Sequence, residues 1–222
     1  MIIRSIYDEM EQSARCIPLG VNSKLIFRHS IRPSLKGCMD PGSVPLTPEG
    51  ICLAQFFGRE LAVELGAICT SDVRRCRETI EAILEARHQI DATIVVADAL
   101  SEVFLKDKGL FQELSVGKMG LKDLVLQMNK KEVIPGLFDL DEYVHRLLDY
   151  MFSVGNEKNT LDLFCTHDLQ IMMIISLLFF RCTSRADILE SWPRMLEGVF
   201  FWGTKDDFYC SWRGQIKHFV GF

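Results

Sequence analysis

Short apolar segments alternate with helical segments along most of this chain. Apolar runs with strand-like composition lie at 24–27, 67–71, 93–97 and 161–165. Most of the longer stretches between and after these runs have apolar residues at helical spacing. Strands that alternate with helices are typical of a layered α/β domain. We therefore expect a three-layer α/β/α architecture with a mostly parallel central sheet.

The length and composition are those of an ordinary globular protein. The 222 residues suffice for a full apolar core, and 48% hydrophobic with 25% charged residues argues against disorder. The region 100–157 is mostly helical but is interrupted by glycines and a Pro-Gly pair. We expect a single domain over residues 1–222, with this region as a helical insertion. Alternating patterns at 198–203 and 207–212 predict a final pair of strands.

The charge balance and the apolar runs disfavour two classes of partner. The chain has 30 acidic and 25 basic residues, a net charge of −5, whereas nucleic-acid binders normally have a surplus of Lys and Arg. The longest apolar run, 171–180, is too short to cross a bilayer and predicts a buried helix. The N-terminus lacks the apolar segment of a signal peptide. We expect neither a nucleic acid nor a membrane as partner.

The eight cysteines are not arranged as a metal site. None forms a CxxC pair or lies at zinc-finger spacing from a histidine. Several lie inside apolar runs, where a thiol behaves as a small buried hydrophobe. Reduced thiols in a cytoplasmic protein are therefore favoured over the disulfides of a secreted one.

Two helix starts are marked by their capping residues. Thr47 precedes Pro48 and Glu49, which combines an N-cap, a first-turn proline and an acidic residue at the positive helix end. We expect this helix to end at Gly66. Asp72 is expected to cap a second helix over 73–87.

A basic hexapeptide follows the first predicted strand. In Arg28-His29-Ser30-Ile31-Arg32-Pro33, two arginines flank a histidine. A solvated basic turn would explain the pattern, but so would an anion site, since guanidinium groups match phosphate and carboxylate geometry. Two neighbouring arginines would lower the pKa of the histidine and keep it neutral. A neutral imidazole can act as a nucleophile.

Three more arginines begin the helix after the second strand. Arg74, Arg75 and Arg77 lie within four positions of one another. They could form an ordinary charged helix face. However, cations at a helix N-terminus oppose the helix dipole, so this placement also fits an arginine that faces a bound anion.

A second histidine follows the fourth strand, in Thr166-His167-Asp168. Asp168 could be a plain helix cap, and His167 a structural residue. In parallel sheets, however, ligands bind at the carboxyl ends of the strands. We therefore expect the polar groups that end the first, second and fourth strands to lie together at one edge.

Taken together, the motifs RHSxRP, LTPEG, TSDVRRCRET and THDLQIMMIISLL resemble the histidine phosphatase superfamily in content, order and spacing. The resemblance covers most of residues 24–180. It implies that His29 is the nucleophile that becomes phosphorylated, and that His167 donates to the phosphate. The family signature has Gly after the nucleophilic His, whereas this chain has Ser30 there, which adds a Cβ beside the phosphate site.

The resemblance also implies the residues that bind the phosphate. Arg28 and Arg32 match the two arginines of the family's RHxxR segment, and Arg75 matches the arginine of its SDLxR segment. Arg74 has no matching role.

Two carboxyl groups are candidates for the proton donor. Asp168 matches the HD pair of the acid-phosphatase and phytase branch, whereas Glu102 matches the LxE segment of the phosphoglycerate-mutase branch. The RHSxRP and THD motifs favour Asp168, and Glu102 stays as the alternative.

The resemblance therefore predicts a phosphatase that hydrolyses small phosphomonoesters through a phosphohistidine, without a metal or another cofactor. Two alternatives stay open. One is a phosphoglycerate-mutase-like phosphotransferase. The other is a catalytically weak relative that binds phosphorylated ligands or a protein partner, for which Ser30 and the apolar segment 199–202 are the reasons.

Overall fold

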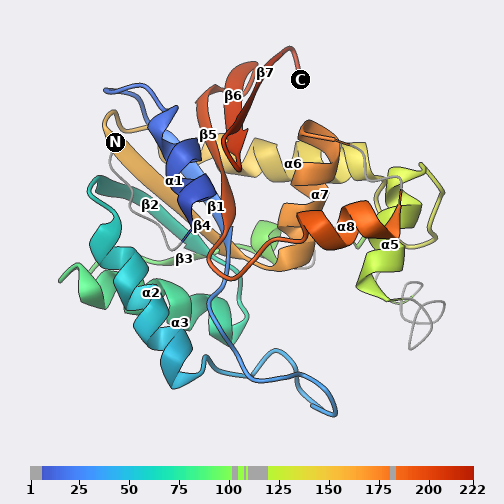
Figure 1. Cartoon of the computed structure of the whole chain (residues 1–222), viewed down its shortest axis with the longest axis horizontal. Coiled ribbons are helices and arrows are strands. Elements are labelled where there is room, and N and C mark those ends of the chain that lie inside the picture. The colour runs from blue at the N-terminus through green and yellow to red at the C-terminus, as the bar shows by residue number, and fades with distance from the viewer. Residues whose placement is uncertain (1–6, 102–104, 108, 110–119, 181–183) are drawn as a thin grey trace.

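A seven-stranded mixed sheet forms the centre of the computed structural model (Figure 1). The structure describes residues 7–101, 105–107, 109, 120–180 and 184–222. The strand order is β3-β2-β4-β1-β5-β6-β7. The strands are β1 (Ser23–Arg28), β2 (Glu64–Thr70), β3 (Val95–Val96), β4 (Thr160–Thr166), β5 (Gly198–Thr204), β6 (Asp207–Trp212) and β7 (Gln215–Val220).

Helices cover both faces of this sheet (Figure 1). One apolar cluster joins it to α1 (Asp8–Arg15), α2 (Pro48–Glu60) and α3 (Arg74–Ala86). The other joins it to α5 (Leu121–Asn129), α6 (Leu140–Ser153), α7 (Asp168–Leu178) and α8 (Arg185–Ser191). A short 3-10 helix, η1 (Asp98–Leu100), follows β3. The expected three-layer α/β/α fold is confirmed.

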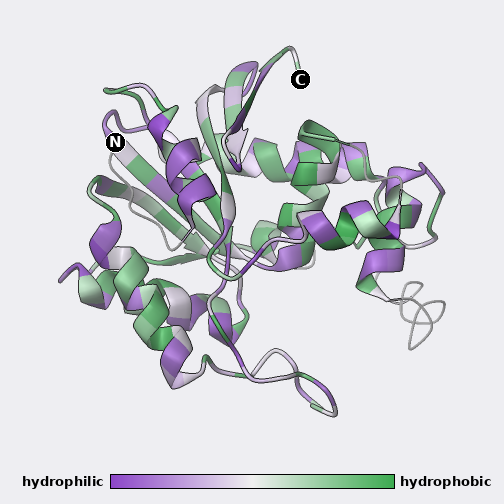
Figure 2. Cartoon of the chain, in the orientation of Figure 1, coloured by the Kyte–Doolittle hydropathy of each residue, from purple (hydrophilic) through white to green (hydrophobic). Residues whose placement is uncertain are grey.

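Side chains of the central strands alternate between the two clusters, as the pleat of a strand requires. In β1, Leu25 and Phe27 belong to the cluster of α1–α3, and Ile26 belongs to the opposite one. Strands buried on both faces read as continuous apolar runs, which is why the sequence made them recognisable. Figure 2 shows α7 as largely hydrophobic, and its residues are almost all buried.

The expectation of a mostly parallel sheet holds for one half only. β3, β2, β4 and β1 pair in parallel, whereas β5 runs antiparallel to β1, and β6 and β7 continue as an antiparallel meander. The short connections from β5 to β6 and from β6 to β7 explain the meander, since neighbouring strands joined by tight turns must be antiparallel. β7 has no apolar alternation and was not expected from the sequence; its residues are mostly exposed.

Two expected helix boundaries are wrong. The helix that starts after Thr47 ends at Glu60, and Gly66 lies inside β2. Glycine is needed there because a Cβ would lie 2.2 Å from Oδ1 of Asp162 on β4. The N-cap of α3 is Val73, not Asp72. Asp72 instead accepts a 2.7 Å hydrogen bond from the Ser101 hydroxyl.

The helical region expected at 100–157 contains α5 and α6 among its described residues. Its status as an insertion into a single domain stays a prediction. The apolar segment 199–202 lies in β5 and is buried, so core packing explains its composition. None of the helices in the described part of the chain is long and apolar enough to span a membrane.

A buried ion pair lies between β1 and β4. Lys24 Nζ is 2.8 Å from Asp162 Oδ2, and the two side chains are 1% and 0% exposed. Nζ also donates to the Val154 carbonyl, and Asp162 Oδ1 accepts from the Ala67 amide. These added hydrogen bonds offset the desolvation cost of burying two charges. Lys24 lies near the start of β1, whereas the candidate site described next lies at its end.

Candidate active site

The carboxyl ends of β1 and β4 bring the two motif histidines together. Arg28 is paired in register with Thr166, and the His29 amide donates to the Thr166 carbonyl at 3.0 Å. His29 and His167 are therefore the next residues of two neighbouring strands. Their ring centroids are 5.5 Å apart, at an interplanar angle of 68°. The expected gathering of polar groups at this edge is present.

Arg75, from the first turn of α3, bridges the two imidazoles. Its Nε donates to Nε2 of His29 at 3.0 Å, and its Nη2 donates to Nδ1 of His167 at 3.2 Å. A guanidinium group can only donate, so both of these ring nitrogens are acceptors. The proton of His29 is therefore on Nδ1, which donates to the Ser30 carbonyl at 2.7 Å. The proton of His167 is on Nε2, 3.2 Å from the Ser71 hydroxyl.

His29 is held in the neutral form. His29 is 2% exposed, and burial lowers its pKa from the ordinary value of 6.5 to about 2. The Ser30 carbonyl opposes this shift, whereas the positive charges of Arg75 and Arg28 add to it. The sequence prediction of a neutral imidazole thus agrees with this result, but burial rather than the flanking arginines is the main cause.

The histidines open onto a cavity of about 750 Å³. Arg32 and Arg75 lie in its wall, together with Asp168 and the buried Gln170. The loop 35–42, the residues 72–73 after β2 and the segment 98–101 also contribute to the wall, and they add three exposed carboxylates, namely Asp40, Asp72 and Asp98. A hollow of this size at the carboxyl ends of parallel strands is the usual place for a small-molecule site.

Arg28 and Asp168 form an ion pair beside the histidines. Arg28 Nη2 is 2.8 Å from Asp168 Oδ2, and its Nη1 donates to the Pro193 carbonyl at 2.7 Å. The Trp192 indole donates to the same carboxylate oxygen at 3.1 Å. Asp168 is the first residue of α7, and the N-cap is His167. Arg28 itself is not part of the described cavity lining.

Two guanidinium groups retain buried donors without a partner. In the described residues, neither Arg28 Nε nor Arg32 Nε has a hydrogen-bond acceptor, although both atoms are shielded from solvent. An unmet buried donor costs about 1–3 kcal/mol, so such atoms are normally kept for a reason. An anion at this edge would supply the missing acceptors.

Ser30, which replaces the family glycine, is directed away from the cavity. It is fully buried, and its hydroxyl donates to the Gly50 carbonyl in α2 at 2.7 Å. Its amide donates to the Thr79 hydroxyl on α3. The added Cβ therefore carries a structural hydrogen bond and does not line the described cavity.

Two further sequence candidates are Glu102 and Arg74. Glu102 lies outside the described residues, although Ser101 directly before it lines the cavity. Arg74 forms an exposed ion pair with Glu78 on the same helix, in keeping with its lack of a matching role.

Ser71 follows β2 and contacts His167, as expected for a polar residue at a strand end. Sequence reasoning missed three residues that contact the site. The Pro41 carbonyl accepts from Arg75, and Trp192 and Pro193 hold Asp168 and Arg28. These three lie in loops without a recognisable pattern. No group of three or more His, Cys, Asp or Glu within the described ranges is arranged to bind a metal.

Comparison with known proteins gives one family. The model of the histidine phosphatase superfamily (branch 1) matches residues 30–184. Sequence comparison with curated proteins finds no match.

Solved structures with the same fold include three enzymes. A phosphoglycerate mutase from Bacillus anthracis is 13% identical, with a TM-score of 0.52 over 84% of this chain and 90% of that one. A mycobacterial glucosyl-3-phosphoglycerate phosphatase is 14% identical, with a TM-score of 0.53 over 88% and 100% of the two chains. A phosphoserine phosphatase from Entamoeba histolytica is 17% identical, with a TM-score of 0.52 over 81% and 90%.

The contacts of Ser30 predict the effect of restoring the glycine. Ser30→Gly should lower the free energy of unfolding by about 1–2 kcal/mol, because it removes a buried hydrogen bond and adds backbone freedom. Turnover per folded molecule should be retained. Urea unfolding and an aryl phosphate assay check this; loss of turnover in a folded variant would contradict it.

The low pKa of His29 predicts a pH-dependent stability. Below pH 6.5 the unfolded chain binds a proton at this imidazole, whereas in the folded protein the imidazole stays neutral down to about pH 2. Stability therefore falls as the pH falls through this window, by about 2 kcal/mol at pH 5 relative to pH 7 from this group alone. His29→Gln should lose that much less stability between pH 7 and pH 5. Equal losses in urea unfolding would refute the assignment.

Proposed function

Because this chain belongs to the histidine phosphatase superfamily, we propose that it hydrolyses small phosphomonoesters through a phosphohistidine on His29, without a metal ion. The observation that carries the proposal is the state of His29. Its proton is on Nδ1, fixed by the Ser30 carbonyl, so the lone pair on Nε2 is available. Nε2 contacts the guanidinium of Arg75, the kind of group that binds a phosphoryl oxygen.

Three guanidinium groups at the site provide charge for binding a phosphate dianion. Arg28, Arg32 and Arg75 supply three positive charges, Asp168 in its ion pair with Arg28 offsets one of them, and three exposed carboxylates also line the cavity. The two unpartnered Nε donors, of Arg28 and Arg32, would bind phosphoryl oxygens. On phosphate binding, Arg75 would transfer its Nε hydrogen bond from His29 to the phosphoryl group and release the nucleophile. Phosphoryl transfer requires mainly such positioning and charge neutralisation.

The reaction has two steps. In the first, His29 Nε2 attacks phosphorus in line, the bond from phosphorus to the ester oxygen breaks, and a carboxylic acid protonates the departing alcohol. In the second, water attacks phosphorus, the bond from nitrogen to phosphorus breaks, and the same carboxylate accepts the water proton. With Arg75 turned to the phosphate, His167 would carry its proton on Nδ1, accept from the Ser71 hydroxyl at Nε2, and donate to a phosphoryl oxygen in both steps.

The contacts of Asp168 favour Glu102 as the proton donor. A general acid must carry its proton before the reaction begins. Asp168 Oδ2 accepts from Arg28 and Trp192, and Oδ1 accepts from the Leu169 amide. Both oxygens thus act as acceptors, the arrangement of a carboxylate. We assign Asp168 the task of holding Arg28 and keep it as the alternative donor.

The two rival functions share this site. A mutase-like phosphotransferase would form the same phosphohistidine but return the phosphoryl group to a substrate, so phosphate release would be slow. A weak relative that only binds phosphorylated ligands is less well supported, because Ser30 does not fill the cavity and segment 199–202 is buried. A cytoplasmic location is proposed from the cysteine content alone.

Removing the nucleophile tests the proposed mechanism. His29→Ala should abolish hydrolysis of p-nitrophenyl phosphate, because the two hydrogen-bond partners of the ring, Arg75 and the Ser30 carbonyl, cannot take the place of Nε2 as nucleophile. EDTA should leave the wild-type rate unchanged. Phosphate release measured by malachite green checks both expectations, with circular dichroism as the control for folding. Normal turnover in His29→Ala would exclude the mechanism.

A pair of substitutions separates the two candidate acids. The donor's substitution should slow alkyl phosphates far more than aryl phosphates, because a good leaving group needs no proton. We expect this pattern in Glu102→Gln. Asp168→Asn should slow both substrate classes to a similar extent, since it releases Arg28 rather than removing a proton. The reverse assignment of the two patterns would make Asp168 the donor.

A further inference from the structure

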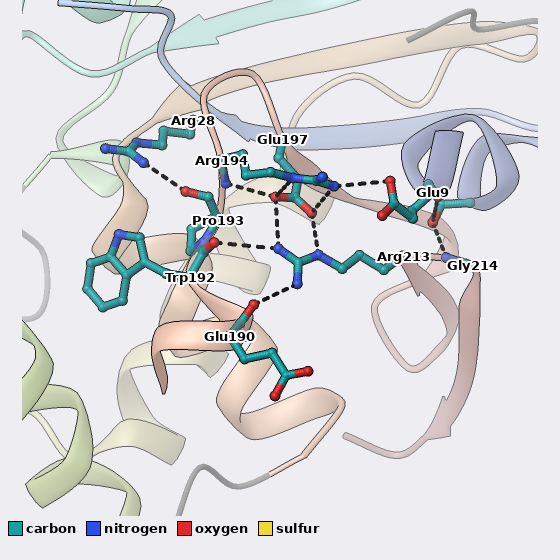
Figure 3. Close-up of polar contacts among 10 residues, drawn as sticks. Glu9, Arg28, Glu190, Trp192, Pro193, Arg194, Glu197, Arg213 and Gly214 are labelled. Carbon is teal, nitrogen blue, oxygen red and sulfur yellow. Dashed lines mark hydrogen bonds and ion pairs between the residues drawn. The ribbon is translucent and has the colours of Figure 1, made fainter. Parts of the chain in front are cut away.

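A buried carboxylate lies behind the site and outside the described cavity lining. Glu197, directly before β5, is 1% exposed. Figure 3 shows its carboxylate between the guanidinium groups of Arg194 and Arg213. Arg213 Nε donates to Oε1 at 2.6 Å and its Nη2 to Oε2 at 3.1 Å, while the Arg194 amide donates to Oε2 at 2.8 Å. All of these contacts are charge-assisted and therefore strong.

Both arginines also contact aromatic rings. Arg194 lies 3.9 Å from the centre of the Tyr7 ring and also pairs with Glu9 on α1. Arg213 lies 4.5 Å from the centre of the Trp212 ring. Glu197 is thus the centre of a network that joins the β6–β7 turn and α1 to the residues before β5. Burial raises the pKa of Glu197, but the bonds from Arg213 and Arg194 more than offset this and keep it low.

The network fixes residues 192–197, which we call the 192–197 turn. Arg213 Nη2 reaches the Trp192 carbonyl at 3.5 Å, and its Nη1 donates to the Glu190 carbonyl at 2.9 Å. Leu196 in this turn is buried and has a φ of 61°, a left-handed conformation that costs a non-glycine residue free energy. The ion pairs around Glu197 hold the turn in this conformation.

The same turn holds Arg28 from three directions. The Arg28 amide donates to the Glu197 carbonyl at 3.0 Å, and the Leu196 amide donates to the Arg28 carbonyl at 3.1 Å. The Pro193 carbonyl accepts from the Arg28 guanidinium at 2.7 Å, a contact drawn in Figure 3. The Trp192 indole fixes Asp168, the ion-pair partner of Arg28.

We propose that Glu197 is a positioning residue, which acts through the 192–197 turn to fix the guanidinium of Arg28 for phosphate. The inference rests on the proposed function, because it takes Arg28 as a phosphate-binding group. Glu197 does not touch the cavity, so its effect reaches the anion only through Pro193, Trp192 and Arg28. A displaced guanidinium loses its geometry toward phosphate. A misplacement of about 1 Å at an active site can lower the reaction rate by up to about a hundredfold.

The test measures binding of inorganic phosphate by isothermal titration calorimetry. Glu197→Gln keeps the shape of the side chain and removes the charge that holds both arginines. It should weaken phosphate binding by about tenfold. Arg213→Gln removes the same ion pair from the more exposed side, so it provides a second variant if Glu197→Gln does not fold. It should weaken phosphate binding in the same direction.

Asp162→Asn is the matched control. Asp162 is also a buried, ion-paired carboxylate, but it contacts the start of β1 and not the site. This variant should lose stability and bind phosphate as the wild type does. If Asp162→Asn and Glu197→Gln weakened phosphate binding equally, a general loss of stability would explain the effect, and the proposal would be overturned.

A double-mutant cycle tests the route through Arg28. In an Arg28→Gln background, Glu197→Gln should cause no further loss of phosphate affinity, because the group that it positions is already gone. Additive losses would contradict the proposal, as would a single Glu197→Gln variant with wild-type affinity. Wild-type turnover of p-nitrophenyl phosphate is measured in parallel. A wild type that neither turns over nor binds phosphate would refute the proposed function, and this inference with it.

Discussion

The register of β1 against β4 is the constraint on which the whole site depends. Because Arg28 is paired with Thr166, His29 and His167 leave two adjacent parallel strands side by side. The Ser71 amide, at the end of β2, donates to the Cys165 carbonyl, and this aligns the third strand end with them. A slip of one residue would turn His29 or His167 to the opposite face of the sheet. The buried ion pair of Lys24 and Asp162, which are partners in this register, opposes such a slip.

Burial and hydrogen bonding then set the state of the nucleophile. The Ser30 carbonyl fixes the tautomer of His29, and burial keeps the ring neutral over the physiological range. Arg75 connects this ring with His167 and brings a positive charge directly to the free nitrogen. The same buried edge that suppresses protonation of the imidazole also leaves Nε of Arg28 and Nε of Arg32 without a hydrogen-bond acceptor among the residues that the structure describes.

The sequence was most informative where local chemistry and long apolar runs agree. Thr47 caps α2 as expected, the strand ends locate His29 and His167, and the start of the helix after β2 locates Arg75. Features that depend on distant contacts could not be predicted in this way. Gly66 resembles a helix terminator, and only the position of Asp162 on another strand shows why it is a glycine.

The role of the C-terminal part was also beyond sequence reasoning. The exposed strand β7 has no alternating pattern, and the antiparallel direction of β5 depends on its pairing with β1. Pro193 contributes a backbone carbonyl, which leaves no trace in the side-chain pattern. For the same reason, the motif that contains Arg28 did not reveal that this side chain is held by the 192–197 turn and Asp168.

Trapping the covalent intermediate tests the central claim most directly. The protein would be mixed with a phosphomonoester, quenched in alkali within the first turnover, and digested for peptide mass spectrometry and phosphorus NMR. The account predicts an acid-labile, alkali-stable phosphoryl group on Nε2 of His29. Rapid turnover with no phosphorylated histidine, or with the phosphoryl group on another residue, would contradict it.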